Sequence, residues 1–227
     1  MSKPRVPARR VAIALPTGVL LPGALRILGR SGVARLSATE LGRKLLVERP
    51  AVRVVLVRPA DVPAYVDHGA ADLGIVGKDV LWESPGAHYE LADLRFGGCR
   101  LVLAVPATSK VAGRETWPPL FRVATKYPRT TAAWFEAHGQ SVEVVALHGS
   151  VELAPQVGLV DGIVDLTASG RTLRENNLRV AAVLGTSTAR LIANQASLKT
   201  RTDAVQSIVA RLRAATDQPA ARARAAS

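Results

Sequence analysis

Apolar residues fall into seven short runs along this chain, each bounded by glycine, proline or charged residues. The runs are rich in β-branched side chains, which favour a pleated and buried environment. Each is too short to form a long helix, so together they predict buried strands. They cover residues 10–16, 53–58, 72–77, 99–106, 121–126, 141–149 and 161–166.

Between these runs, apolar positions recur at the three- and four-residue spacing of an amphipathic helix. The helical patterns cover residues 22–30, 61–69, 129–138, 151–158 and 171–177, and a last one covers 203–215. Strands that alternate with helices predict an α/β fold with largely parallel sheets. Residues 107–120 are polar and rich in proline and glycine, which indicates a crossover between two lobes.

Length and composition set further limits. The chain has 227 residues, 48% of them hydrophobic, which suits one large domain or two small lobes. Its single cysteine, Cys99, cannot form a disulfide within the chain and points to a reducing compartment, the cytoplasm. The apolar N-terminal stretch is broken by Pro16, Gly18 and Pro22, so we expect neither an export signal nor a membrane span.

The net charge of +12 raises the question of nucleic-acid binding. Residues 1–10 carry a net +4 and residues 190–227 a net +5, which leaves only +3 for the middle of the chain. Charges that gather at chain ends usually form solvated arms. We therefore expect no nucleic-acid partner, whereas small polyanionic substrates remain compatible with this charge.

The segment 160–178, VDGIVDLTASGRTLRENNL, carries the most informative chemistry. An apolar strand ends at Leu166, a short loop follows, and a helix is expected to open near Thr172. Such a junction directs backbone N–H groups at one point, Thr167 and Ser169 add hydroxyls, and Gly170 permits a tight turn. These features can hold a phosphate monoester. In the alternative interpretation, Thr172 only caps a helix.

Two acids lie on either side of this strand. Asp161 and Asp165 are four residues apart, which on a strand places them on one face. Carboxylates beside a phosphate loop can bind ribose hydroxyls or Mg²⁺. Ordinary turn residues are the alternative.

The same segment resembles the phosphoribosyl-pyrophosphate loop of ATP phosphoribosyltransferases. Further stretches resemble this family in the same order: residues 56–81, 96–106, 122–135 and 149–166. The resemblance extends from about residue 10 to residue 215. It assigns contacts with the phosphoribosyl donor to Thr167, Ala168, Ser169, Gly170, Arg171 and Thr172, together with Glu152, Asp161 and Asp165.

The resemblance implies a two-lobed fold of the periplasmic-binding-protein type II class, with the substrates in a cleft between the lobes. Lobe one would comprise residues 1–105 and 186–227, and lobe two residues 106–185. The implied reaction opens histidine biosynthesis: N1 of the adenine of ATP attacks the anomeric carbon of phosphoribosyl pyrophosphate and expels pyrophosphate. Mg²⁺ is implied as the cofactor, without an assignment of the acids that bind it.

The family also implies roles for charged residues outside the loop. Arg43 and Arg58 would stabilise the leaving pyrophosphate, since arginine binds phosphate through a planar fork. Without the resemblance, both would be interpreted as solvated surface arginines, and Glu152 equally well as a helix-start acid. Contacts with the nucleotide would come from Gly18, Asp93, Lys126 and Tyr127.

One departure from the family pattern is visible. Where most members read PKGRL, this chain reads PTGVL, with Thr17 and Val19 in place of two cations. A catalytically weak paralogue, or a small-molecule sensor that uses the same fold, is therefore the alternative function. The chain's length resembles the short form of the family, which implies a regulatory partner related to histidyl-tRNA synthetases and feedback inhibition by histidine.

Overall fold

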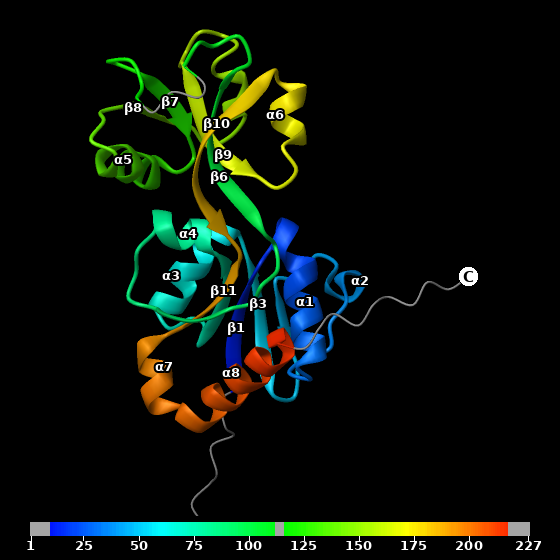
Figure 1. Ribbon diagram of the computed structural model, residues 1–227. Coiled ribbons are helices and arrows are strands. Elements are labelled where there is room, and N and C mark those ends of the chain that lie inside the picture. Colours follow the sequence, from blue (N-terminus) through cyan, green and yellow to red (C-terminus); the bar gives the residue numbers. More distant parts are fainter. Residues whose placement is uncertain (1–9, 112–115, 218–227) are drawn as a thin grey trace, which may run out of the picture. The chain divides into compact units, whose positions relative to one another are not determined.

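The computed structural model describes residues 10–111 and 116–217. The chain divides into two compact units (Figure 1). Unit 1 consists of Met1–Gly77, Gly86–Gly97 and Ala189–Ser227, and unit 2 of Lys78–Pro85 and Gly98–Thr188.

Unit 1 is built on a six-stranded sheet of order β2-β3-β1-β4-β11-β5. The strands β1, β3 and β4 are parallel, whereas β2, β11 and β5 pair antiparallel to their neighbours. The strands are β1 (Val11–Pro16), β2 (Leu46–Glu48), β3 (Val52–Val57), β4 (Leu73–Gly77), β5 (Tyr89–Asp93) and β11 (Ala189–Ala193). The helices are η1 (Gly18–Leu20), α1 (Leu21–Arg30), α2 (Ala38–Leu41), η2 (Pro59–Asp61), α3 (Val62–Asp67), α7 (Gln195–Thr200) and α8 (Thr202–Asp217).

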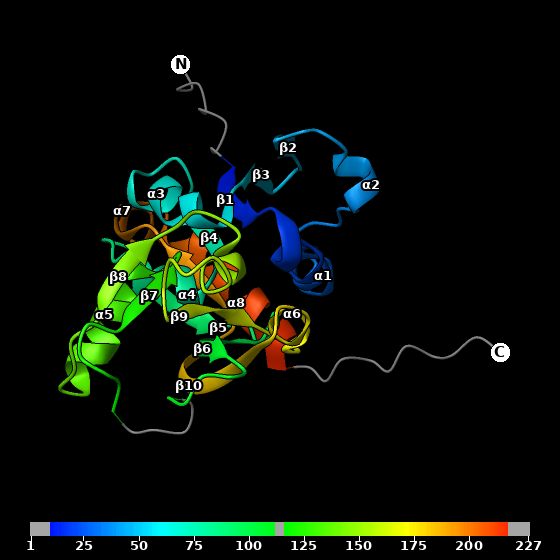
Figure 2. The same cartoon turned by 90° about the horizontal axis from the view of Figure 1, so that it is seen from above.

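Helices cover both faces of this sheet. On one face, Ile13 and its alternate neighbours pack against the apolar sides of α1 and α8. On the other face, α3 packs close to Gly74, where a Cβ would lie 2.8 Å from side-chain carbons of Val62 and Val66. Figure 2 shows α1 and α3 on opposite sides of the central strands. Unit 1 is thus a three-layer structure with a fully buried central strand, β1.

Unit 2 has a five-stranded sheet of order β10-β6-β9-β7-β8. Its strands β7, β8 and β9 are parallel, and β6 runs antiparallel to both β9 and β10. One face packs under Val151 and Leu173, and the other under Trp82 and Phe135. The elements are α4 (Lys78–Glu83), β6 (Cys99–Pro106), β7 (Arg122–Thr125), α5 (Pro128–Ala137), β8 (Glu143–Ala146), η3 (Val151–Leu153), β9 (Gly162–Thr167), α6 (Arg171–Glu175) and β10 (Leu178–Ser187).

The seven predicted strands all occur, with ends that differ by three residues or fewer. The expectation of largely parallel sheets is wrong, because five of the nine strand pairs are antiparallel. Four strands that the apolar runs did not predict, β2, β5, β10 and β11, all pair antiparallel. The predicted helix at 151–158 is only the short η3 followed by turns.

The division into units differs from the lobe boundaries expected from the sequence. Residues 98–105 belong to unit 2, because β6 pairs with β9 and β10 in its sheet. Residues 78–85, which include α4, also belong to unit 2, and the return to unit 1 comes at Ala189.

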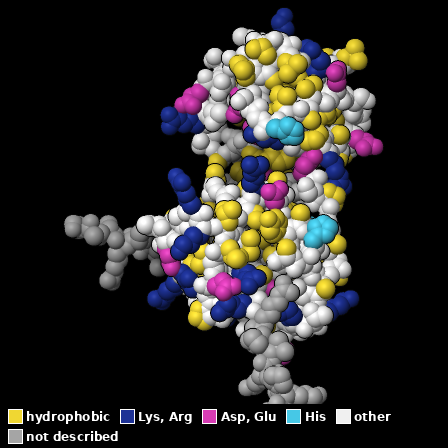
Figure 3. Space-filling view, turned by 180° about the vertical axis from the view of Figure 1, so that it is seen from behind, with side chains coloured by type: hydrophobic (Ala, Val, Ile, Leu, Met, Phe, Trp, Pro, Cys, Tyr) yellow, Lys and Arg dark blue, Asp and Glu magenta, His cyan; other side chains and the backbone are white. Residues whose placement is uncertain are grey.

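Basic side chains do not form one continuous patch on the face shown in Figure 3, where lysines and arginines are interspersed with acids. The basic residues of the N-terminal arm, Lys3, Arg5 and Arg9, lie outside the described residues. Within the described ranges, no helix combines the length and the apolar character that crossing a bilayer requires.

Candidate functional site

The predicted phosphate loop lies in unit 2, at the carboxyl end of β9. Gly170 has a φ of 72°, a left-handed conformation that glycine adopts without strain. The Oγ1 of Thr167 accepts a hydrogen bond from the N–H of Gly170 at 2.9 Å, and the Oγ of Ser169 accepts one from the N–H of Arg171 at 3.4 Å. The hydroxyls therefore shape the loop.

The same hydroxyls also remain able to bind a ligand. No described residue accepts a hydrogen bond from the O–H of Thr167 or Ser169, so both can donate to a phosphate. The helix that follows, α6, has only five residues, so its dipole contributes less than the sequence pattern suggested. The Arg171 side chain pairs with Glu175 along α6, and its backbone N–H donates to the Oγ of Ser169, so its predicted donor contact stays a prediction.

Three charged residues lie beside the loop. Asp165 precedes it on β9, Lys126 follows β7, and Glu152 lies in η3, just after β8. Burial raises the pKa of the Asp165 carboxyl; the Leu166 N–H and the Lys126 ammonium oppose this rise, and the Glu152 carboxylate adds to it. Since β7, β8 and β9 are parallel, their carboxyl ends meet at one edge, the usual position of ligands in α/β sheets.

The Tyr127 hydroxyl points elsewhere. It donates a hydrogen bond to Oδ2 of Asp79 at 3.3 Å, and Ser187 donates to Oδ1 of the same carboxylate at 2.6 Å. Burial, and then the charge of Asp79, raises the pKa of Tyr127 far above its ordinary value, so the hydroxyl remains a donor. The Tyr127 hydroxyl thus has a structural partner, and the predicted contact of Tyr127 with the nucleotide stays a prediction.

Asp79 itself was missed by the sequence reasoning. It is 8% exposed and begins the short α4, and its backbone N–H donates to the Oγ of Ser187 at 3.0 Å. The available signal was a carboxylate inside the apolar stretch from 73 to 81, where a charged side chain needs a partner. Its partners lie 48 and 108 residues away, so the sequence did not reveal them.

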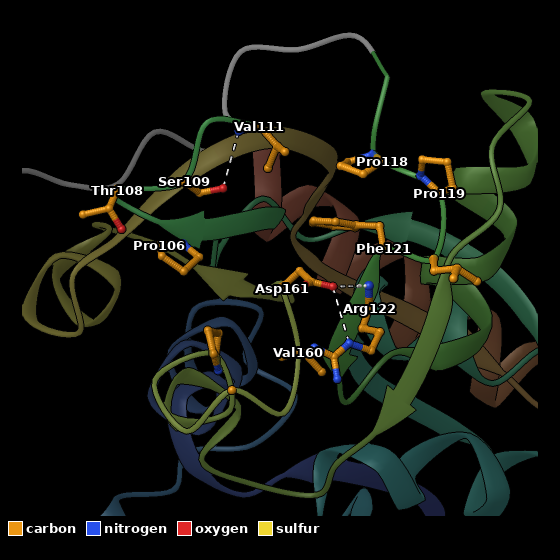
Figure 4. A pocket seen from close by; sticks show the side chains of 13 residues that line it. Pro106, Thr108, Ser109, Val111, Pro118, Pro119, Phe121, Arg122, Val160 and Asp161 are labelled. Carbon is orange, nitrogen blue, oxygen red and sulfur yellow. Dashed lines mark hydrogen bonds and ion pairs between the residues drawn. The ribbon is translucent and has the colours of Figure 1, made fainter.

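Asp161 lies at the opposite end of β9 from the phosphate loop, so the structure does not place it with the other donor-contact residues. Its Oδ2 accepts a hydrogen bond from the N–H of Arg122 at 2.8 Å and lies 3.5 Å from Nε of the same arginine (Figure 4). Both residues line a cavity of about 640 Å³ that also includes Pro106 and Phe121. Asp161 and Arg122 form an ion pair that joins the starts of β7 and β9, and the predicted donor contact of Asp161 stays a prediction.

Two exposed arginines, Arg43 and Arg58, lie at one edge of the sheet in unit 1. Arg58 follows β3, and the backbone N–H of Thr17, after β1, donates to the carbonyl of Val57 at 2.8 Å. Arg43 lies three residues before β2. The segment between them lies beside the end of β3, because the N–H of Leu56 donates to the carbonyl of Leu45. Both arginines are exposed, and no described residue pairs with either. The structure thus brings together Arg43, Arg58 and the Gly18 turn, whose φ is 79°.

Asp93, predicted to contact the nucleotide, is already engaged within unit 1. Its Oδ2 lies 3.2 Å from Nη1 of Arg190, and its Oδ1 accepts a hydrogen bond from the N–H of Arg95 at 2.8 Å. The antiparallel pair of β5 and β11 places Arg190 opposite Asp93. The carboxylate therefore holds these two strands together, and its predicted contact with the nucleotide stays a prediction.

The residues beside the phosphate loop include acids that could bind Mg²⁺. The described residues contain no group of three or more histidine, cysteine or acidic side chains that could enclose a metal ion. Mg²⁺ commonly binds through one or two carboxylates together with substrate phosphates. Asp165 and Glu152, two acids beside a phosphate loop, fit that mode.

Comparison with known proteins identifies the family. The model of the family described as HisG: ATP phosphoribosyltransferase matches residues 58–214. The ATP phosphoribosyltransferase of Caldanaerobacter subterraneus subsp. tengcongensis is 45% identical over 205 residues, which cover 89% of this chain and 96% of that protein. That of Symbiobacterium thermophilum is 49% identical over 210 residues, covering 89% and 93%.

Solved structures agree. The ATP phosphoribosyl transferase (HisG:HisZ) complex from Thermotoga maritima contains a chain that aligns with a TM-score of 0.76 and 34% identity, covering 91% of this chain and 98% of that one. The alkanesulfonate-binding protein SsuA from Xanthomonas axonopodis pv. citri aligns with a TM-score of 0.58 at 14% identity, covering 91% and 72%, which shows a shared fold alone. The chain belongs to the ATP phosphoribosyltransferase family.

Proposed function

We propose that this protein transfers the phosphoribosyl group of phosphoribosyl pyrophosphate to ATP, the first step of histidine biosynthesis. The lone pair of adenine N1 forms a bond to the anomeric carbon, while the bond from that carbon to the pyrophosphate oxygen breaks and its electron pair leaves with pyrophosphate. The observation that carries the proposal is the phosphate loop at the carboxyl end of β9, with two free hydroxyl donors and a left-handed glycine.

Each residue has a task in this reaction. The loop 167–172 binds the 5′-phosphate of the donor through N–H and O–H groups, and Glu152 and Asp165 orient the ribose hydroxyls or hold Mg²⁺. When bound, the metal neutralises charge on the diphosphate. Arg43 and Arg58 provide permanent positive charge for the departing pyrophosphate, which forms no covalent bond to the protein. Lys126 supplies a further cation at the loop edge.

The reaction is tested with purified chain, ATP, phosphoribosyl pyrophosphate and Mg²⁺, by following the absorbance of the phosphoribosylated nucleotide together with released pyrophosphate. Equal amounts of both products support the transfer. Absence of both products, with and without a regulatory subunit, while ligands still bind, would favour the small-molecule sensor, which shares the fold of the sulfonate-binding protein but needs no reaction.

We also propose that the chain works as a short-form catalytic subunit with a regulatory partner related to histidyl-tRNA synthetases, through which histidine inhibits. Its support is the Thermotoga maritima structure, whose chain this protein covers to 98% and whose name describes a complex. Co-purification followed by turnover with and without histidine tests it; inhibition of the isolated chain by histidine would contradict it. The unpaired Cys99 favours the reducing cytoplasm as the compartment.

A further inference from the structure

A second cavity, separate from that of Arg122 and Asp161, lies within unit 1 and has a volume of about 410 Å³. Its wall is formed by Gly18, by the first half of α1 as far as Arg26, and by residues 36–38. Leu21, Leu25 and Leu36 make most of this wall apolar. Arg26 contributes the only charge among the lining residues, and Ser37 a hydroxyl.

The Arg26 side chain is free to bind a ligand. It is exposed, and no described residue forms an ion pair or hydrogen bond with it. Long side chains on a helix lean toward its N-terminus, over the preceding turn. The Arg26 guanidinium is therefore expected over Pro22, four residues earlier, and toward Gly18. Gly18 and Pro22 both line the cavity.

This end of the cavity lies at the edge of the sheet that carries the other free cations. Gly18 follows the carboxyl end of β1, and its neighbour Thr17 is hydrogen bonded to Val57, the residue before Arg58. The turn from Thr17 to Val19 has no charge of its own, and Val19 is 92% exposed. Arg26 is the first cation that follows this turn along the chain.

We propose that Arg26 binds a phosphate group at the Gly18 end of this cavity, with the Ser37 hydroxyl as a second donor. The ligand is a diphosphate or triphosphate, and it has two sources, the triphosphate of the nucleotide or the diphosphate of the phosphoribosyl donor. The inference deepens the proposed function and rests on it for the identity of these substrates. A guanidinium binds phosphate through two parallel N–H donors, a geometry that a lysine ammonium lacks.

The test measures binding by calorimetry with three probes: inorganic pyrophosphate, ATP and phosphoribosyl pyrophosphate. Arg26→Gln removes the cation, Arg26→Lys restores it without the planar fork, and Lys199→Gln is the control that makes the same change in net charge. Lys199 lies in α7, the helix that follows β11. The last residue of β11, Ala193, pairs with Leu73, the first residue of β4. Lys199 is therefore at the opposite edge of the sheet from Arg26. Thermal unfolding of each variant verifies its fold.

Arg26→Gln is expected to raise the Kd for pyrophosphate about tenfold or more, the scale of one lost charge-assisted hydrogen bond, with Arg26→Lys intermediate and Lys199→Gln unchanged. A loss shared with ATP assigns the phosphate to the nucleotide, and one shared with the donor assigns it to the diphosphate. Parent-like affinity of Arg26→Gln for all three probes overturns the proposal, as does equal weakening by Lys199→Gln. Pyrophosphate binding is measured without turnover, so failure of the proposed reaction is seen separately.

Discussion

Gly170 is the residue whose backbone most directly shapes the phosphate loop. Its φ of 72° costs an L-residue about 1–2 kcal/mol, and a Cβ there would lie 3.0 Å from Nη1 of Arg174. Gly170→Val should therefore distort the loop and weaken binding of the phosphoribosyl donor at least tenfold in calorimetry. Gly139→Val is the matched control, since Gly139 has a φ of 66° in open space after α5. Equal donor affinity in both variants would contradict the assignment.

The raised pKa of Asp165 implies that its ionised carboxylate lowers the free energy of unfolding. Burial raises that pKa, so between the ordinary value near 3.8 and the higher folded value the folded state binds more protons than the unfolded state. The free energy of unfolding therefore falls as pH rises through this window and stays lower above it. Asp165→Asn should remove this dependence and raise the melting temperature at neutral pH.

The same substitution separates stability from function. If Asp165 binds the ribose or Mg²⁺, Asp165→Asn lowers donor affinity while it stabilises the fold. Melting curves at several pH values and calorimetry at neutral pH provide the two measurements. A variant that is no more stable than the parent, or that binds the donor equally well, contradicts one half of this prediction.

Sequence reasoning at the residue scale succeeded where the chemistry is local. Thr167, Ser169 and Gly170 are adjacent in the chain, so their common loop could be expected. Asp161 was grouped with them because of its spacing from Asp165, but a strand of six residues separates it from the loop. The partner of Tyr127 could not be found, because Asp79 is brought to it only by tertiary packing.

At the scale of elements, the register of β2 and β3 explains why two arginines fifteen residues apart leave the sheet at one edge. Each arginine is exposed and free, so its truncation leaves no buried charge behind. Arg43→Ala and Arg58→Ala should each lower turnover by about 10²- to 10³-fold, as when a preorganised donor to a transition state is removed. Lys199→Ala, at the other edge, should leave it unchanged.

Single-turnover kinetics verify this prediction, since they exclude effects on product release. Normal single-turnover rates in both folded variants would show that the two arginines are surface residues. A fall in turnover in the Lys199 variant as well would point to a general effect of net charge.

The central strands of unit 1 were predicted well because both of their faces are buried, although β11, buried at four of its five positions, was missed. The central strands β1 and β4 are buried at every position and form continuous apolar runs. By contrast, β5 has two exposed residues and three half-buried ones, and most positions of β10 are exposed or half-buried. Such strands lack the apolar run on which the prediction depended, and β2 has only three residues. These are antiparallel strands, so their omission explains the wrong expectation of largely parallel sheets.

For the whole molecule, the resemblance gave the fold class correctly, because long motifs in fixed order specify a fold better than periodicity does. The unit boundaries followed less well from sequence. The chain passes between the units at Gly77, Pro85, Gly97 and Thr188, and only the last two passages have a counterpart among the expected crossings. No composition change marks α4 as part of unit 2, since its membership depends on contacts with α5 and β10.

This connectivity predicts that the units unfold together. The chain passes between the units four times, and the strand β4 of unit 1 continues directly into α4 of unit 2. Leu28 is fully buried in unit 1, so Leu28→Ala should cost about 2–5 kcal/mol. The three tryptophans, at positions 82, 117 and 134, all lie in unit 2, so their fluorescence reports that unit alone.

We expect the Leu28→Ala substitution to lower the fluorescence midpoint and the circular-dichroism midpoint equally, whereas Leu45→Ala, at a 66% exposed position of unit 1, should change neither. An unchanged fluorescence midpoint beside a new early transition in circular dichroism would instead show that the two units are independent.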